Sequence, residues 1–166
     1  MSKRIACILA LAMCITLPTA SAGEAGALKP PTGFTLPGLD GKTHELAEWR
    51  NKVVLLNFWA SWCSPCQTEI RDLVVFQAKY GAQGLQIIGI GMDDETKLRN
   101  VQRSLEINYP VLLANSPGNP LMARYGNRSG VVPYSVLISR QGEVVYTYTG
   151  LINNEIFAEQ VIPRLK

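Results

Sequence analysis

The stretch "VVLLNFWASWCSPCQTEI", residues 53–70, decides the fold class of this chain of 166 residues. Its first part, residues 53–60, is almost continuously apolar, which is typical of a strand buried on both faces. Residues at helical spacing follow: Cys66, Ile70, Leu73, Val74, Gln77 and Tyr80. Gly81 and Gly84 are expected to stop this helix. A buried strand followed directly by a helix predicts an α/β fold with both cysteines at the junction.

The segments on either side extend this pattern. Two short extended pieces are expected around Asp40-Gly41, with a helical turn at 47–50. Further strands are predicted at 85–92 and from Pro110, and helices at 95–106, in "NPLMARYG" from Asn119, and at 153–165. "YSVLIS" and "EVVYTYTG" form a predicted hairpin. Alternating strands and helices followed by a hairpin indicate a mixed central sheet with helices on both faces.

The N-terminus has the pattern of a secretory signal peptide. Lys3 and Arg4 precede an apolar run to Leu17, and Ala20-Ser21-Ala22 provides a small-residue cleavage site. The apolar run is shorter than the roughly 20 residues of a membrane-spanning helix, although an uncleaved anchor is the alternative. We expect a signal peptide at 1–22, a flexible leader at 23–32 and a single domain at 33–166.

Signal cleavage changes the charge and the thiol content. It would remove Lys3 and Arg4 but no acidic residue, which leaves the chain close to neutral. Nucleic-acid binding therefore has no support, because no basic block remains to neutralise phosphates. It would also remove Cys7 and Cys14, so that Cys63 and Cys66 become the only thiols, in a compartment where disulfides persist.

The C-x-x-C spacing indicates redox chemistry at the start of a helix. Free backbone N–H groups and the helix dipole there stabilise a thiolate, so Cys63 is the expected nucleophile. Pro65 is tolerated at such a position, because its missing N–H would have had no partner. Cys66, one turn further along, is expected to be more shielded and to resolve the mixed disulfide.

Other uses of two cysteines are less consistent with the sequence. A tetrahedral zinc site needs four ligands, and the only histidine, His44, lies on a different segment. An inert disulfide would close a very short loop and constrain the unfolded chain little. Delivery of copper by two thiolates and His44 stays open. We expect no resident metal and no cofactor.

The chain resembles the thioredoxin superfamily, and more narrowly the TlpA/ResA-like extracytoplasmic thiol-disulfide oxidoreductases. The likeness covers about residues 34–166, through "FTLPGLDGKTHEL", "WCSPC", "YGAQGLQIIGIGMDD", "INYPVLLA" and "GVVPYSVLISRQGEVVYTYTG". The resemblance implies a thioredoxin-like fold with an N-terminal extension and a helical insert. It also implies a redox-active Cys63–Cys66 disulfide.

Four further residues take expected roles from this resemblance. Pro133 matches the family's cis-proline, which leaves the backbone of Val132 free to pair with an extended substrate. Trp62 matches the aromatic residue that shields the thiols. Glu69 matches a proton-handling glutamate of ResA-like members, although an acid in a helix's first turn can simply complement the dipole.

The sequence departs from thioredoxin at Asn57, where thioredoxin has a buried aspartate. Asn57 cannot exchange a proton with Cys66, so Glu69 is the preferred carboxylate and Asp93 a weaker candidate. Peroxide reduction is the nearest other enzymatic activity. It is disfavoured because Ala60 stands where peroxiredoxins have a threonine.

The expected function is reduction of disulfides in exported proteins, for example apocytochrome c, in the bacterial periplasm. An integral-membrane electron carrier is the expected source of electrons. Ser64-Pro65 lacks the histidine that strong oxidants place between their cysteines, which favours an intermediate or reducing centre. The alternatives are a disulfide-forming or isomerising enzyme, or a redox-dependent module that binds copper or a partner.

Overall fold

The computed structural model describes residues 33–114 and 120–166. The expected signal peptide and leader lie outside the described residues. The strands are β1 Thr35–Pro37, β2 Thr43–Glu45, β3 Val53–Trp59, β4 Leu85–Gly91, β5 Val111–Leu113, β6 Tyr134–Ile138 and β7 Val144–Thr149. The α-helices are α1 Ser64–Tyr80, α2 Glu95–Ser104, α3 Pro120–Arg124 and α4 Asn154–Gln160. Short 3₁₀ helices are η1 Leu46–Trp49, η2 Gly81–Gln83 and η3 Ile162–Arg164.

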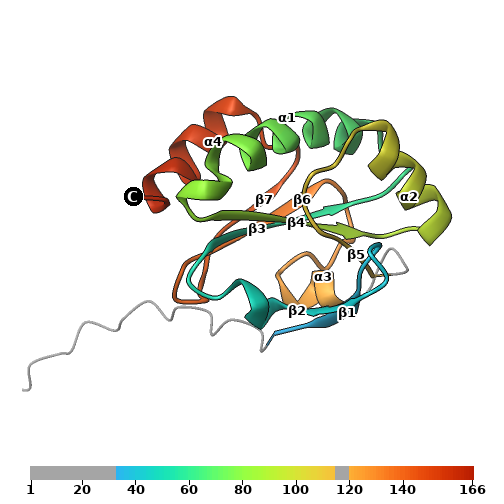
Figure 1. Ribbon diagram of the computed structural model, residues 1–166, viewed down its shortest axis with the longest axis horizontal. Coiled ribbons are helices and arrows are strands. Elements are labelled where there is room, and N and C mark those ends of the chain that lie inside the picture. The colour runs from blue at the N-terminus through green and yellow to red at the C-terminus, as the bar shows by residue number, and fades with distance from the viewer. Residues whose placement is uncertain (1–32, 115–119) are drawn as a thin grey trace, which may run out of the picture.

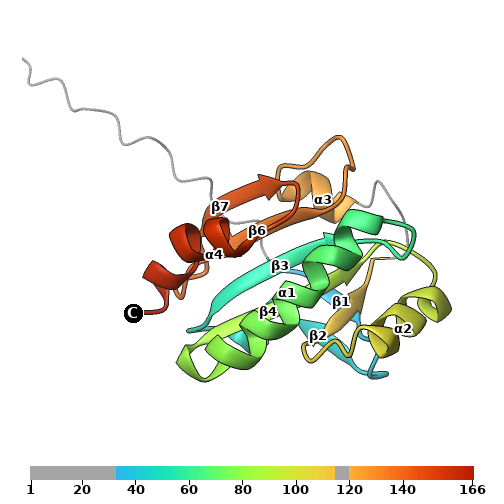
Figure 2. The same cartoon turned by 90° about the horizontal axis from the view of Figure 1, so that it is seen from above.

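The central sheet has five strands in the order β5-β4-β3-β6-β7. β3 pairs in parallel with β4, and β4 with β5, whereas β6 is antiparallel to both β3 and β7. Helices α1 and α4 lie over one face, and α3 lies over the other together with the β1–β2 hairpin (Figure 1). Seen from above, α1 runs across β3 and β4 (Figure 2). The predicted mixed sheet with helices on both faces is confirmed.

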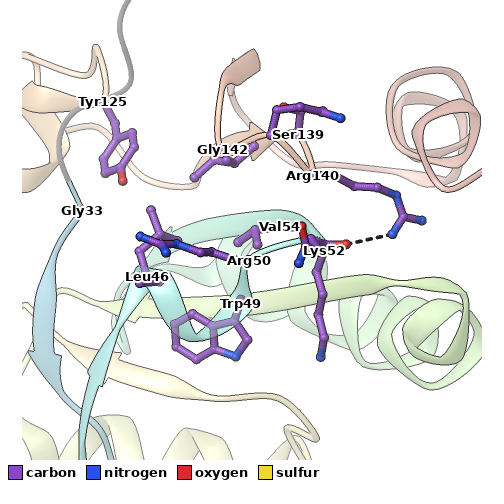
Figure 3. A pocket seen from close by; sticks show the side chains of 14 residues that line it. Gly33, Leu46, Trp49, Arg50, Lys52, Val54, Tyr125, Ser139, Arg140 and Gly142 are labelled. Atoms are coloured by element: carbon purple, nitrogen blue, oxygen red, sulfur yellow. Dashed lines mark hydrogen bonds between the residues drawn. The ribbon is translucent and has the colours of Figure 1, made fainter.

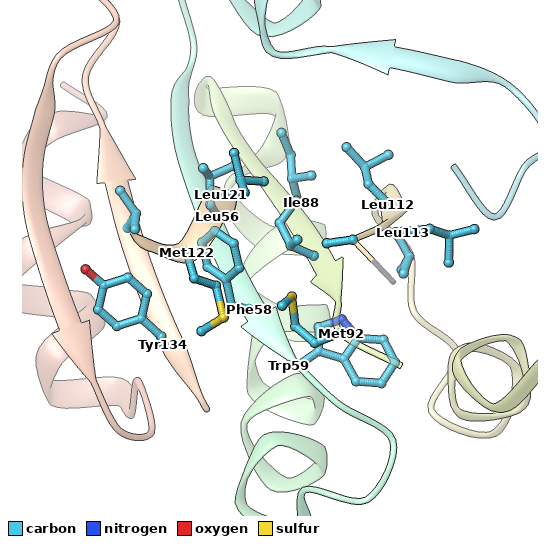
Figure 4. Close-up of a cluster of buried hydrophobic side chains, with 14 of the residues drawn as sticks. Leu56, Phe58, Trp59, Ile88, Met92, Leu112, Leu113, Leu121, Met122 and Tyr134 are labelled. Atoms are coloured by element: carbon cyan, nitrogen blue, oxygen red, sulfur yellow. The ribbon is translucent and has the colours of Figure 1, made fainter. Parts of the chain in front are cut away.

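β3 is buried on both sides because it lies in the centre of this sheet. Alternate side chains point to opposite faces of a strand. Leu56 and Phe58 therefore join the cluster beneath α3 (Figure 4), whereas Val53 and Leu55 join the cluster beneath α1 and α4. Asn57 follows the second set, so it is the one polar side chain that β3 directs toward α1.

Helix α1 begins and ends as the sequence predicts. Cys63 is its N-cap residue, and Pro65 lies in the first turn. The helix ends at Tyr80 with Gly81 as its C-cap residue, and Gly84 takes a left-handed conformation (φ 98°) that glycine adopts readily.

Two predicted helices are shorter than expected. The closing helix, predicted over 153–165, ends at Gln160 and continues as the 3₁₀ helix η3. Pro163 explains this difference, because its ring cannot be placed inside an α-helix. Helix α2 ends at Ser104 rather than at residue 106, and Glu106 has a left-handed backbone (φ 51°). In the described part of the chain, the helices are too short or too polar to cross a membrane.

Candidate active site

The two cysteines lie at the junction between β3 and α1. They form a disulfide with an S–S distance of 2.09 Å. The backbone N–H of Cys66 donates to Cys63 Sγ at 3.2 Å. Cys63 retains 4% of its surface exposed, whereas Cys66 is completely buried. After reduction, Cys63 would be the accessible thiol, at a helix start where N–H groups favour its thiolate.

The Val132–Pro133 peptide bond lies at the same end of the sheet and is cis, which is the geometry implied by the resemblance. Tyr134 follows directly and pairs with Phe58 near the end of β3, so this segment lies beside the turn that carries the cysteines. Trp62 and Val131 are 64% and 51% exposed. These two apolar side chains flank the disulfide and the cis-proline in the sequence, and both are available to an incoming chain.

Glu69 is completely buried on α1. Its position argues against the simpler explanation that it only complements the helix dipole. The first turn of α1, from Ser64 to Gln67, contains no acidic residue, and Glu69 lies in the next turn with no exposed surface. The backbone N–H of Ile152 donates to Glu69 Oε1 at 2.7 Å. Asn57 Nδ2 donates to Glu69 Oε2 at 2.7 Å. The interpretation of Glu69 as an acid in the helix's first turn that only complements the dipole is therefore wrong.

The environment of Glu69 favours proton exchange near neutral pH. Burial raises the pKa of Glu69 from 4.5 to about 7, because the ionised carboxylate loses its hydration. The two hydrogen bonds from Ile152 and Asn57 lower the pKa, and nearby Asp72 raises it. Cys66 lies three residues earlier, on the same face of the helix. A carboxyl group that titrates near 7 is suited to exchange a proton with a thiol.

Asp93, the weaker carboxylate candidate, has different surroundings. It accepts hydrogen bonds from Ser61 Oγ and from Lys97 Nζ, and chiefly the Ser61 bond holds its pKa below the usual range. It therefore stays ionised at neutral pH, which makes it a poor proton carrier.

His44 lies in β2 and is held away from the cysteines by other partners. Its ring nitrogens are 2.9 Å from Glu48 Oε2 and 3.1 Å from Asp40 Oδ2, and these two carboxylates raise its pKa. The geometry does not bring His44 to the thiols. In residues 33–114 and 120–166, no three His, Cys, Asp or Glu side chains are grouped as a metal site would require.

A pocket of about 600 Å³ lies at the opposite end of β3 from the disulfide (Figure 3). Its lining includes Trp49, Val54 and Arg140, and the Arg140 guanidinium donates to the carbonyl oxygen of Asn51. The cysteines are not in this pocket. The redox site therefore lies apart from this pocket, where the cysteines follow β3 and the cis-proline precedes β6.

Sequence reasoning missed two partners of Glu69. Asn57 stands out as a polar residue in an apolar strand, but its contact with Glu69 was not predicted. Ser135 Oγ accepts a hydrogen bond from Asn57 Nδ2 at 3.2 Å, and Ile152 contributes only a backbone N–H. Neither a serine in a strand nor a backbone amide forms a sequence pattern that predicts contact with a buried carboxyl group or its partners.

Comparison with known proteins identifies the family. The model of the AhpC/TSA family matches residues 29–147. A thiol-disulfide oxidoreductase ResA of Bacillus cereus is 32% identical over 123 residues, which cover 74% of this chain and 69% of the relative. The chain belongs to the ResA-like thiol-disulfide oxidoreductases of the AhpC/TSA family. A second ResA, from Geobacillus thermodenitrificans, is also 32% identical, over 125 residues that cover 74% of this chain and 68% of the relative.

Solved structures agree with this family. A thiol:disulfide interchange protein of the thioredoxin family from Chlorobium tepidum has a TM-score of 0.75 at 27% identity, covering 87% of this chain and 100% of the other. An exposed lipoprotein thioredoxin of Streptococcus pneumoniae has a TM-score of 0.65 at 29% identity, covering 77% and 96%. This ResA-like protein is a thiol-disulfide oxidoreductase with a thioredoxin-like fold.

Proposed function

We propose that this ResA-like enzyme reduces disulfides in exported proteins through Cys63 and Cys66, with Glu69 as the proton-handling group. The observation that carries the proposal is the arrangement of three features at one end of the sheet. These are the disulfide at the start of α1, the cis Val132–Pro133 bond, and the buried carboxyl group of Glu69.

The reaction transfers two electrons and two protons to the substrate. The Cys63 thiolate attacks one sulfur of the substrate disulfide, that S–S bond breaks, and the other sulfur leaves as a thiolate that takes a proton. Cys66 then gives its proton to the Glu69 carboxylate and attacks Cys63 Sγ. The mixed disulfide breaks, the second substrate thiolate leaves and is protonated, and the Cys63–Cys66 disulfide forms.

The substrate is proposed to be an extended segment of a protein. The backbone of Val132 would pair with it beside the cis-proline, through main-chain hydrogen bonds to the extended segment. Trp62, next to Cys63 in the sequence, and Val131, next to Val132, offer exposed apolar surface. Because these contacts are mostly main-chain and apolar, they would accept many sequences.

The proposed location is the bacterial periplasm or another extracytoplasmic space, supported by the signal-like pattern of residues 1–22. The proposed substrates include apocytochrome c, whose haem-binding cysteines must be reduced. The oxidised enzyme would then need electrons from an integral-membrane carrier. The proposed substrate and the membrane carrier rest on family analogy.

The direction of electron flow is tested by the reduction potential of the Cys63/Cys66 pair, measured by equilibration against glutathione or dithiothreitol buffers. A value below about −220 mV is expected for a reductase. A value of about −120 to −160 mV would overturn the reductase proposal, because electrons would then flow from substrate thiols to the enzyme.

Glu69→Gln is expected to slow exchange and to raise the pH at which it proceeds. Without the carboxylate, Cys66 must lose its proton to solvent, and an ordinary thiol does so only near pH 8.5. The measurement is the rate of disulfide reduction across pH 6 to 9. Equal rates for the variant and the wild type at every pH would contradict the proton-transfer role.

A stability measurement serves as the control for Glu69→Gln. Because folding raises the pKa of Glu69 from 4.5 to about 7, the folded state binds more protons than the unfolded state between these values. The contribution of Glu69 to wild-type stability is therefore expected to decrease as pH rises through this window. The variant should lack that decrease and remain folded, which separates slow chemistry from loss of structure.

A further inference from the structure

The side-chain amide of Asn57 makes two hydrogen bonds through its nitrogen and none through its oxygen. Its side chain is fully buried in β3. Nδ2 donates to Glu69 Oε2 at 2.7 Å and to Ser135 Oγ at 3.2 Å. The buried Oδ1 has no hydrogen-bond partner among the described residues. A buried polar atom without a partner is costly, so this arrangement calls for an explanation.

The hydrogen bonds around Glu69 match its ionised state. An ionised carboxylate only accepts hydrogen bonds, and both of its oxygens here face N–H donors, from Asn57 and from Ile152. A neutral carboxyl group carries an O–H and needs an acceptor. The N–H of Ile152 is fixed in the backbone and cannot become an acceptor, so of these two donors only Asn57 can adapt.

A half-turn of the Asn57 amide supplies that acceptor. The rotation exchanges the positions of Oδ1 and Nδ2, so that Oδ1 faces Glu69 and Ser135. The Ser135 hydroxyl can follow, because a hydroxyl group both donates and accepts. Oδ1, the atom without a partner in the ionised state, is then used in the neutral state, and Nδ2 takes the position without a partner.

We propose that Asn57 is a positioning residue whose side-chain amide donates a hydrogen bond to ionised Glu69 and, after rotation, accepts one from neutral Glu69. The Ser135 hydroxyl changes from acceptor to donor when the Asn57 amide rotates. Both states of the carboxyl group then keep a hydrogen bond with Asn57. The consequence for disulfide exchange rests on the proposed function of Glu69.

Few charged or titratable groups compete with Asn57 for this role. Asp72 of α1 and the buried Tyr109 interact electrostatically with Glu69, and burial and the Glu69 charge both raise the pKa of Tyr109. The cysteines precede Glu69 on α1.

Among the other elements packed nearby, β3 and β4 contain no titratable residue. The glutamates of α4 are exposed, and Tyr134 of β6 lies in the cluster beneath α3. Tyr148 of β7 pairs with Ser135 in the sheet.

Nuclear magnetic resonance tests the proposal directly in the oxidised protein, where the cysteines do not titrate. The Glu69 carboxyl carbon reports its ionisation, and the side-chain N–H₂ resonances of Asn57 report the amide. The amide resonances are expected to change with the same midpoint as the Glu69 carboxyl carbon, and Glu69→Gln should abolish that change. Amide resonances that stay constant through the Glu69 midpoint would overturn the proposal.

Two variants provide a matched comparison. Asn57→Leu keeps a similar volume but removes the N–H donor, so the midpoint of Glu69 should rise by about one pH unit or more. Ser135→Ala leaves the bond between Asn57 and Glu69 intact and should shift the midpoint by less than about half a pH unit. An unchanged midpoint in Asn57→Leu would overturn the proposal. If that variant does not fold, the wild-type and Glu69→Gln resonances decide the question.

The pH profile of disulfide reduction distinguishes this proposal from the proposed function. Asn57→Leu should move the profile to higher pH in the wild-type background and should cause no further movement in the Glu69→Gln background. Absence of exchange in the wild-type protein would contradict the proposed function, whereas the carboxyl titration would still test Asn57. A profile that moves equally in both backgrounds would overturn the positioning role.

Discussion

Cys63→Ser is expected to abolish disulfide reduction, with a loss of about 10³-fold or more. The serine hydroxyl is a far weaker nucleophile than the thiolate that the start of α1 stabilises. The remaining thiol of the described residues, Cys66, is completely buried and cannot reach a substrate in its place. The measurement is reduction of a model protein disulfide in the presence of a chemical reductant. Activity within tenfold of the wild type would contradict the assignment of Cys63 as the nucleophile.

Cys66→Ser provides the matched control, because the buried residue acts after the nucleophile. This variant should still attack a substrate, but the mixed disulfide should persist, since nothing displaces it from Cys63. It should therefore be captured as a covalent complex that dithiothreitol releases. A protein that only binds partners would instead capture them equally well with both cysteines replaced.

Phe157→Ala is expected to lower the free energy of unfolding by about 3 to 5 kcal/mol. The ring is 1% exposed and stacks on Phe76, with 3.8 Å between the ring centroids, and it also lies 5.4 Å from the ring of Tyr80. These contacts hold α4 against α1. Truncation leaves a cavity between the two helices, and the loss is a large part of the roughly 5 to 15 kcal/mol typical of a domain. Urea unfolding measures the effect.

Val75→Ala is the control for Phe157→Ala. Val75 lies on α1 but is 59% exposed, so its truncation should change stability by less than about 0.5 kcal/mol. A similar loss of unfolding free energy in both variants would contradict the prediction, because the buried Phe157 ring would then contribute no more than an exposed side chain. A change in the slope of the urea transition would indicate instead that the denatured state had changed.

Local sequence patterns predicted the parts of the site that depend on neighbouring residues. The apolar run of β3, the start of α1 at Cys63 and the end of α1 near Gly81 all follow from periodicity and capping. The boundaries of α4 were less well predicted, although Pro163 was visible in the sequence. Periodicity alone predicts a helix that extends past this proline, whereas α4 ends at Gln160.

The environment of Glu69 could not be predicted in the same way. Its position on α1 allowed either an acid that complements the helix dipole or a proton-handling group, and the sequence left both open. Burial decides between them, and burial depends on the segment around Ile152, which lies 83 residues away in sequence. Likewise, Asn57 and Ser135 are 78 residues apart and meet only because β3 pairs with β6.

The sequence by itself determined the α/β class, the strand–helix junction and the two cysteines placed at a helix start, because each depends on residues within a few turns of one another. Tertiary structure alone decided that Glu69 is buried, that its pKa is raised to about 7, and that Asn57, Ser135 and Ile152 surround it. The physical reason is that burial and hydrogen bonding of a side chain are set by the strands and loops packed over it, and these come from distant parts of the chain.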